Sequence, residues 1–347
     1  MQGMNRREFL RATTATGAAL LAGELLYGVS NGDQAAKIPE AEKITITVIT
    51  DNLADVTRPD YKIAKRPANV NSPLDSALHG EHGLSYHIET VVNGESHSCL
   101  FDFGSNAKGV MENISMLKID LKKVKALGLS HDHWDHQAAL VEILRGKKED
   151  FPNGIPFYTG EQFFAGSCSR RPSDGKVFGA GLKREDIEAL GFVKIVEIRN
   201  PTPIIPGAVL PGKIEQVTEY EKIPPQFLVK KGNDLVQDTF PGEQAVILNA
   251  RGKGLVVLSG CAHRGIVNTV KQAQRMTGIE KVCAVMGGFH LTGAKPELIQ
   301  KTIADIKAIS PEYIVPTHCT GFEAITAFAR EMPNQFILNT VGTRYTF

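Results

Sequence analysis

The chain has 347 residues, of which 42% are hydrophobic and 22% are charged, a composition typical of a globular protein with a sizeable core. Its 39 lysines and arginines nearly balance its 38 aspartates and glutamates, and no long run of one charge occurs. This balance argues against nucleic acid or an anionic membrane surface as a partner.

The N-terminus differs in kind from the rest of the chain. Arg6 and Arg7 precede a mild apolar run from Ala12 to Leu26, a pattern that resembles a twin-arginine export signal. An amphipathic helix is the alternative, but the apolar run is continuous rather than periodic. We therefore expect residues 1–35 to be a signal peptide read by the twin-arginine translocation machinery. The mature protein would then be periplasmic or otherwise exported, with no membrane span left after the signal is removed.

The mature domain, residues 36–347, begins with segments that predict β-strands. Residues 43–50 alternate strictly between polar and apolar side chains. Residues 84–93 and 97–104 are two further strand-like runs, joined through Asn93-Gly94, which is a hairpin signal. The domain is therefore expected to start with β-structure.

A helix over residues 106–120 and a strand over residues 123–130 are expected next. That strand leads directly into the sequence SHDHWDH, Ser130–His136, which holds three histidines and two aspartates in seven residues. The following residues, 135–146, predict the next helix. The histidine cluster therefore lies in the connection between a strand and a helix.

The composition of the chain changes over residues 149–241, which contain many prolines and glycines and show no sustained hydrophobic periodicity. We interpret this segment as an irregular, lid-like insertion in the same domain. Short apolar runs that alternate with helices follow it, including a helix that begins at Pro296 with Ile299, Ile303 and Ile306 on one face. This order of elements predicts an α/β fold.

The SHDHWDH segment has the composition of a catalytic metal site. Imidazoles and carboxylates are ligands that zinc, iron and manganese share, whereas closed structural zinc sites often contain cysteines. His131 and His133 are two residues apart in an extended loop, so both can project to one side. With Asp135 and His136 in the following turn, the segment has enough donors for parts of two adjacent metal sites.

The pattern His-x-His-x-Asp-His at a strand end resembles the signature of the metallo-β-lactamase superfamily. The resemblance implies a four-layered αββα sandwich, with two mixed sheets face to face, helices outside and a metal site at one edge. It also implies that further ligands follow later strands. Histidines do end three later strand-like runs, at His263, His290 and His318.

By this resemblance, His263 joins the first two histidines of the loop at one metal, and His318 joins Asp135 and His136 at a second. The superfamily's bridging aspartate is missing, and His290 stands nearest to its place in the chain. An imidazole cannot bridge two metals as a carboxylate oxygen does. His290 is therefore a candidate for a ligand of one metal, for a contact with the substrate, or for an inert core histidine.

Two further kinds of residue border the proposed ligands. Asp102 resembles the superfamily's strand-end aspartate, which orients the metal loop by hydrogen bonds; its alternative role is an N-cap for the next helix. Cys261 and Cys319 each neighbour a proposed ligand. Because adjacent residues on a strand point in opposite directions, we do not expect the two thiols to bind metal.

A series of short motifs narrows the resemblance to one branch of the superfamily, the metal-dependent hydrolases grouped with the archaeal dihydropterin–aminobenzene-ribofuranosyl phosphate synthases. It covers nearly all of the chain after the signal, and GGFHL and HCTG are the motifs most specific to this branch. In chain order the motifs are TDN, EHGLS, LFDFG, LSHDHWDH, GEQAVIL, LSGCAHRGIVN, MGGFHL and PTHCTG.

These observations predict an exported metal-dependent hydrolase in which a metal-bound hydroxide attacks an ester, lactone or phosphoester-type bond of a small molecule. Asp135 and His290 are the candidate catalytic residues. Zinc is the expected metal, as one or two ions, with iron and manganese as alternatives. Two other functions stay open. One is a synthase-like transfer with pyrophosphate departure, which export disfavours, and the other is a non-catalytic metal- or ligand-binding module.

Overall fold

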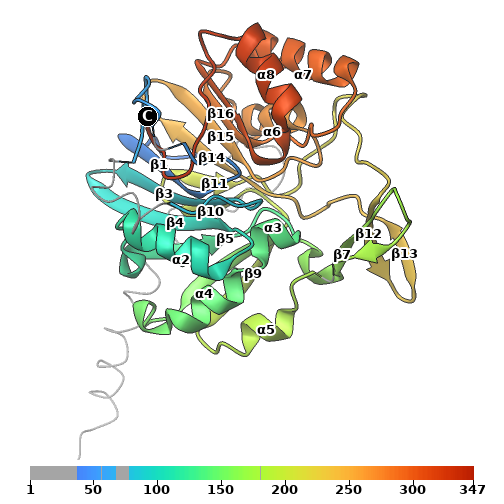
Figure 1. The fold of residues 1–347 in the computed structure, drawn as a ribbon. Coiled ribbons are helices and arrows are strands. Elements are labelled where there is room, and N and C mark those ends of the chain that lie inside the picture. The colour runs from blue at the N-terminus through green and yellow to red at the C-terminus, as the bar shows by residue number, and fades with distance from the viewer. Residues whose placement is uncertain (1–36, 56, 68–77, 180) are drawn as a thin grey trace, which may run out of the picture. The chain divides into compact units, whose positions relative to one another are not determined.

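The computed structural model describes residues 37–55, 57–67, 78–179 and 181–347 (Figure 1). The twin-arginine signal predicted over residues 1–35 lies outside the described residues, so export stays a prediction. Among the helices in the described part of the chain, none is both long and apolar enough to cross a membrane.

The first of two large sheets has the strand order β2-β18-β1-β3-β4-β5-β6-β9. Its first half is antiparallel, and its second half, from β4 to β9, is parallel. The strands are β1 (Lys43–Thr50), β2 (Ala64–Lys65), β3 (Ser85–Val92), β4 (Glu95–Phe103), β5 (Val124–Gly128), β6 (Ile155–Gly160), β9 (Val193–Ile198) and β18 (Arg344–Thr346).

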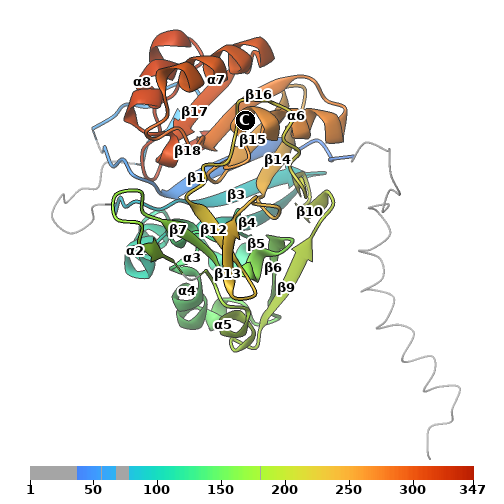
Figure 2. The ribbon, with the colours of Figure 1, turned by 90° about the vertical axis from the view of Figure 1, so that its right-hand side faces the viewer.

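The second large sheet has the order β10-β11-β14-β15-β16-β17 and is also mixed, with parallel pairing from β15 to β17. Its strands are β10 (Thr202–Ile205), β11 (Ala208–Leu210), β14 (Ala245–Ala250), β15 (Gly254–Ser259), β16 (Val282–Gly288) and β17 (Tyr313–Thr317). A small third sheet lies beside both, at the right in Figure 1 and toward the viewer in Figure 2. It consists of β7 (Ser167–Arg170), β8 (Val177–Phe178), β12 (Phe227–Lys231) and β13 (Asp234–Gln237).

Helices cover the outer face of each large sheet (Figure 1). On the first sheet they are α2 (Ala107–Met116), α3 (Trp134–Gln137), α4 (Leu140–Gly146) and α5 (Arg184–Glu188). On the second sheet they are α6 (Ile266–Thr277), α7 (Pro296–Ile309) and α8 (Phe322–Glu331). Short 3-10 helices connect several strands: η1 (Leu121–Lys123), η2 (Lys148–Asp150), η3 (Phe163–Ala165) and η4 (His318–Thr320). The four-layered αββα sandwich is confirmed.

Two apolar layers hold the sandwich together. Between the sheets, Ile88 and Phe101 of the first sheet belong to one buried cluster with Val246 and Leu258 of the second. A separate cluster lies between the first sheet and its helices, where side chains such as Phe157 meet α2 and α4. Burying each such side chain stabilises the fold by about 1.5–3 kcal/mol, so both faces of the central strands contribute.

The expected elements at the start of the domain are present. Residues 43–50 form β1, and the two following runs form the β3–β4 hairpin. Asn93 and Gly94 have φ angles of 53° and 78°, as the tight hairpin turn requires. The single helix expected over residues 135–146 is instead two helices, α3 and α4, separated by Ala138 and Ala139.

The segment 149–241 contributes to all three sheets. Its strands β6 and β9 extend the first sheet, β10 and β11 extend the second, and β7, β8, β12 and β13 form the third. These strands are short, and several have no regular alternation of burial, as in the fully exposed β13. That is why no periodicity was visible in the sequence. Whether the segment is an insertion, and where such an insertion would end, stay predictions.

The backbones at Gly160 and Gly242 pass very close to each other, where the end of the first sheet's strand β6 meets the segment before β14. A Cβ atom on Gly160, the last residue of β6, would clash with the carbonyl oxygen of Gly242. A Cβ atom on Gly242 would in turn clash with the carbonyl oxygen of Glu161. The backbones can therefore approach this closely only because both residues are glycine.

We expect the Gly160→Ala substitution to destabilise the protein by about 1–3 kcal/mol, because the added methyl group overpacks a backbone contact. Denaturant unfolding of the full chain measures the change. Gly146→Ala in α4 is the matched control, since a Cβ atom there has no neighbour within 4 Å. The control should stabilise the protein by up to about 1 kcal/mol through helix propensity. Equal stability of the two variants would contradict the steric account.

Candidate metal centre

The loop after β5 brings the predicted donors to the edge of the first sheet. His133 precedes α3, and Asp135 and His136 lie in its first turn, so the short helix directs their side chains inward. His131 is 2% exposed and His136 is fully buried. The loop therefore presents its donors to the interior of the protein.

Three imidazoles form the first donor group: those of His131, His133 and His263. One ring nitrogen from each lies within 4.8 Å of the others. In this group His131 Nε2 and His263 Nε2 are 3.2 Å apart. His263 follows β15 of the second sheet, so this group joins the edges of both sheets.

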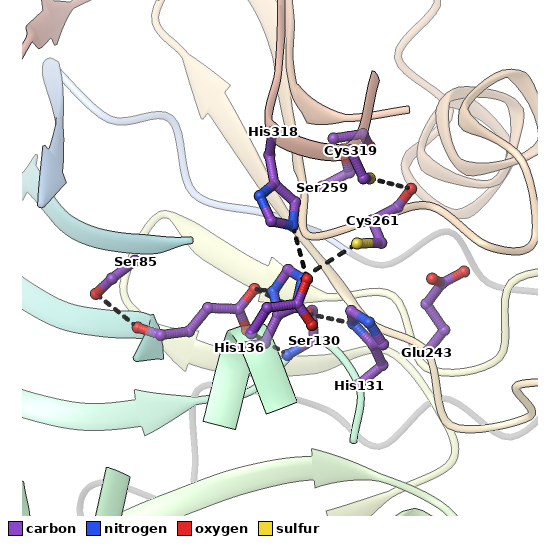
Figure 3. A network of polar contacts seen from close by, with 12 residues as sticks. Ser85, Ser130, His131, His136, Glu243, Ser259, Cys261, His318 and Cys319 are labelled. Carbon is purple, nitrogen blue, oxygen red and sulfur yellow. Dashed lines mark hydrogen bonds and ion pairs between the residues drawn. The ribbon is translucent and has the colours of Figure 1, made fainter. Parts of the chain in front are cut away.

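The second donor group contains Asp135, His136, His318 and, in addition, Cys261. Asp135 Oδ2 lies 3.2 Å from His318 Nε2 and 3.8 Å from His136 Nε2. Cys261 Sγ lies 3.1 Å from His136 Nε2. Figure 3 shows Cys261 and His318 on one side of His136 and His131 on the other. The six residues predicted as ligands therefore fall into the two expected groups.

Cys261 lies among the donors, contrary to the expectation from strand alternation. Alternation does not apply here, because β15 ends at Ser259 and Ala262 has a left-handed φ of 54°. Cys261 and His263 therefore lie in an irregular turn, where each can point to a different donor group. The motif LSGCAH contains the thiol, but no pattern within it indicates the direction of the side chain.

Asp102 orients one imidazole of each donor group: that of His136 directly and that of His131 through Ser130. This buried residue, with a φ of 60°, accepts hydrogen bonds from Ser130 N at 2.7 Å and Ser130 Oγ at 2.8 Å. His136 Nδ1 lies 2.6 Å from its Oδ2 atom. The N-cap of α2 is Asn106, whose side chain accepts from Gly109 N, so the alternative role of Asp102 as the helix cap is wrong.

The donor atoms of the first group fit a divalent cation. Ser130 Oγ donates its one proton to Asp102, so it accepts from His131 Nδ1 at 2.9 Å and leaves a free lone pair on His131 Nε2. Burial lowers the pKa of His131 and His263 well below the usual value, and lowers the pKa of His133 to about 4. His133 Nε2 is buried without a hydrogen-bond partner. Neutral imidazoles with converging lone pairs are ligands of zinc and related metals.

The pKa values of Asp135 and His318 are shifted in opposite directions. Burial opposes ionisation of Asp135, but His136 and His318 outweigh it and hold the pKa of Asp135 well below its usual range. Burial also lowers the pKa of His318, but the hydrogen bond to Asp135 and nearby negative charges raise it to about 9. A divalent cation can take the place of the proton between these two side chains, because both are metal ligands when deprotonated.

Glu243 positions His263 through the backbone. Its buried carboxylate accepts hydrogen bonds from His263 N at 2.6 Å and Arg264 N at 2.7 Å. Burial raises the pKa of Glu243 to about 7. Gly242, whose backbone lies close to that of Gly160, directly precedes Glu243. The sequence contains this residue in the motif GEQAVIL, but nothing in the motif assigns it a role.

His290 lies beside the first donor group but belongs to neither of the two expected groups. Its ring centroid is 4.1 Å from that of His263, and it shares a separate donor cluster with Cys261 and Cys319. It is partly exposed, its φ is 50°, and its Nδ1 atom is buried without a partner. An inert core position is therefore the least suitable of its three candidate roles.

Aromatic side chains surround the centre. Phe240 stacks on His263 with centroids 4.1 Å apart, and Phe227 packs against His133 at 5.2 Å. On the more open side, His82 Nε2 lies 3.4 Å from Asp135 Oδ2, and Trp134, which is 47% exposed, lies next to His82. These two exposed rings therefore lie on the solvent-facing side of the second donor group.

No protein-family model matches the chain. The chain is 35% identical over 281 residues to the 7,8-dihydropterin-6-methyl-4-(β-D-ribofuranosyl)-aminobenzene-5'-phosphate synthase of Methanocaldococcus jannaschii, an alignment that covers 80% of this chain and 92% of the relative. It is also 28% identical over 264 residues to an uncharacterized protein of the same organism, covering 76% of this chain and 92% of that protein.

Solved structures with the same fold include a metal-dependent hydrolase of the β-lactamase superfamily. That structure has a TM-score of 0.67 and 23% identity, and the match covers 87% of this chain and 98% of the hydrolase. A metallo-β-lactamase fold protein from Bacillus subtilis has a TM-score of 0.50 and 13% identity, covering 88% of this chain and all of that one. The chain therefore belongs to the enzymes of the metallo-β-lactamase fold, a fold that implies divalent metal binding, and within them to the family of the M. jannaschii synthase.

Proposed function

We propose that this enzyme is a two-metal hydrolase that cleaves ester, lactone or phosphoester bonds in small molecules. The observation that supports it is the convergence of three donors in one group and four in another, drawn from both sheets. Two adjacent sites of this kind suit attack on a carbonyl or phosphoryl group, because one centre can bind both the attacked oxygen and the nucleophile. Membership of an enzyme family argues against a purely non-catalytic binding module.

The metal in this proposal is zinc, with iron and manganese as alternatives. Neutral imidazoles dominate the first group, and the second mixes imidazole, carboxylate and thiol, which suits zinc better than magnesium or calcium. A bound divalent cation would supply Lewis acidity and would lower the pKa of a bound water molecule to near 7.

The chain's own residues then position the reactants. Asp135 stands at the junction of the second donor group and the exposed rim, since its Oδ2 atom contacts both His318 and His82. His290 borders the first group and is partly exposed, which supports a contact between its ring and the substrate. The rings of Phe227 and Phe240 restrict water around the first group.

A second candidate is a transfer reaction with pyrophosphate departure. It is favoured by the 35% identity to a protein named as a synthase, over 92% of that protein's length. The same donor groups would neutralise the charge that develops on a diphosphate leaving group. Export would separate the protein from a cytoplasmic biosynthetic substrate, which is why hydrolysis is preferred here.

Export by the twin-arginine machinery is part of the proposal, and it is supported by Arg6 and Arg7 ahead of the apolar run from Ala12 to Leu26. That route carries folded proteins, so the metal could be inserted in the cytoplasm.

Isotope incorporation separates hydrolysis from transfer. With the zinc-loaded protein in ¹⁸O-labelled water, we expect one labelled oxygen in the acid or phosphate product of a phosphoester, ester and lactone panel. A dihydropterin diphosphate with an aminobenzene acceptor should give neither coupled product nor pyrophosphate. The control is His263→Ala, expected to lower kcat/KM roughly 100-fold or more, because loss of groups that merely support ligands already costs 10–100-fold. Pyrophosphate release with an unlabelled coupled product would favour the transferase.

We expect His290→Ala to keep the full metal content, because neither the three-imidazole group nor the group around Asp135 needs His290 to be complete. Turnover should fall roughly 10–100-fold through loss of a substrate contact. Elemental analysis and steady-state kinetics measure the two effects. His97→Ala in β4 is the control and should change neither. A loss of one metal equivalent would instead make His290 a ligand.

Export is tested with the Arg6→Lys/Arg7→Lys double variant. We expect the wild-type protein in the periplasmic fraction and the double variant in the cytoplasm, because twin-arginine signals are read by their paired arginines. Arg11→Lys conserves charge in the same segment and should be exported normally. Wild-type protein confined to the cytoplasm would contradict the proposal.

A further inference from the structure

We propose that Cys261 is a metal ligand, whose sulfur binds the same ion as Asp135, His136 and His318. This inference rests on the proposed two-metal function. The fourth donor of the second site is then a thiolate from the turn after β15, outside the histidine-rich loop at residues 130–136.

The spacing of the donor atoms supports this assignment. In a tetrahedral zinc site with ordinary Zn–S, Zn–N and Zn–O distances, any two donors are roughly 3.3–3.6 Å apart. In the structure, Cys261 Sγ is 3.1 Å from His136 Nε2, and Asp135 Oδ2 is 3.2 Å from His318 Nε2 and 3.8 Å from His136 Nε2. All four donors lie within 4.8 Å of one another. These distances bracket the tetrahedral values, so one ion can contact all four atoms after small shifts.

The backbone conformation around Cys261 directs its sulfur toward the second donor group. Gly260 packs against Ser130 and Asp102 so closely that a Cβ atom would clash with the Ser130 hydroxyl. Gly288 donates a hydrogen bond to Gly260 O at 2.9 Å. The left-handed Ala262 then reverses the chain, so the thiol points to the second donor group and the next imidazole, His263, points to the first. One turn thus supplies a donor to each site.

A second anionic ligand favours the binding of two cations in this centre. The first donor group consists of three neutral imidazoles, and Asp135 is the one carboxylate in either group. The bridging aspartate of the superfamily is missing, so two divalent ions would face a single negative charge in a buried site. Uncompensated buried charge is costly, and a metal ion deprotonates a thiol that coordinates it. A Cys261 thiolate therefore supplies the missing negative charge.

The same contacts could instead describe a nucleophile. Cys261 Sγ, His136 Nε2, His136 Nδ1 and Asp102 Oδ2 form a chain with links of 3.1 and 2.6 Å, the order of a cysteine–histidine–aspartate triad. Cys261 is only 2% exposed, however, and its sulfur faces the other donors rather than the rim at His82 and Trp134. The geometry favours coordination, and the experiment below separates the two roles.

X-ray absorption at the zinc edge of the fully loaded protein tests the proposal. We expect a sulfur shell at about 2.3 Å in the wild type. Cys261→Ser should remove that shell, lower the metal content from two equivalents to one and weaken binding at the second site roughly 100-fold. Cys283→Ser, which changes a buried thiol of β16 that belongs to none of the donor groups, is the matched control and should retain the sulfur shell and both metals. Cys319→Ser tests the other thiol beside the centre, which shares a donor cluster with Cys261 and His290, and should also retain the shell.

A second variant guards against simple misfolding. Cys261→Asp restores an anionic donor and should keep two metals without a sulfur shell. The proposal is overturned if the loaded wild type has no sulfur shell, if the shell survives in Cys261→Ser, or if Cys319→Ser alone removes it. A Cys261→Ser protein that holds both metals but has no activity would indicate the nucleophile and overturn the ligand role.

The outcome is independent of whether the proposed reaction is correct. A wild type that hydrolyses its substrates with two metals and no sulfur shell would refute the thiolate and leave the hydrolase standing. A wild type with the sulfur shell but with transfer products in the isotope experiment would support the thiolate and refute the hydrolase.

Discussion

The centre depends on the carboxylate of Asp102. It is fully buried at the end of β4 and accepts hydrogen bonds from the Ser130 backbone, the Ser130 hydroxyl and the His136 ring. These contacts fix one tautomer in His136 and, through Ser130, in His131, so each ring turns its free Nε2 atom toward the donor groups. A buried carboxylate without these donors would be costly, so the loop conformation and the carboxylate stabilise each other.

The metal centre lies where the edges of the two sheets meet. The first sheet contributes the loop after β5, and the second contributes the turns that follow β15, β16 and β17. The apolar layer between the sheets holds these edges in register, and the buried carboxylate of Glu243 fixes the turn that carries His263. Most of the donor side chains thus come from turns and from a short helix, on a scaffold whose stability lies elsewhere.

Much of this arrangement could be predicted from local sequence. The β3–β4 hairpin follows from Asn93-Gly94, and α7 follows from Pro296 and the apolar face at Ile299, Ile303 and Ile306. The short strands of residues 149–241 could not be predicted, because they have no periodic pattern of their own, and strands such as β6 and β9 are set by their place in the first sheet. The break between α3 and α4 could not be predicted for a different reason, since Ala138 and Ala139 at the break are good helix formers.

The sequence by itself determined the kind of chemistry. Three histidines and two aspartates in seven residues have few uses other than metal binding, and later histidines at strand ends complete the set. The resemblance already indicated how the histidines and Asp135 divide between two groups. Only the tertiary structure decided that Asp102 orients two rings rather than capping a helix, and that Cys261 joins the second group. The physical reason is that the direction of a side chain depends on contacts with residues distant in the sequence. The left-handed conformation of Ala262 and the close packing at Gly260 turn the Cys261 thiol toward His136, more than a hundred residues away in the chain.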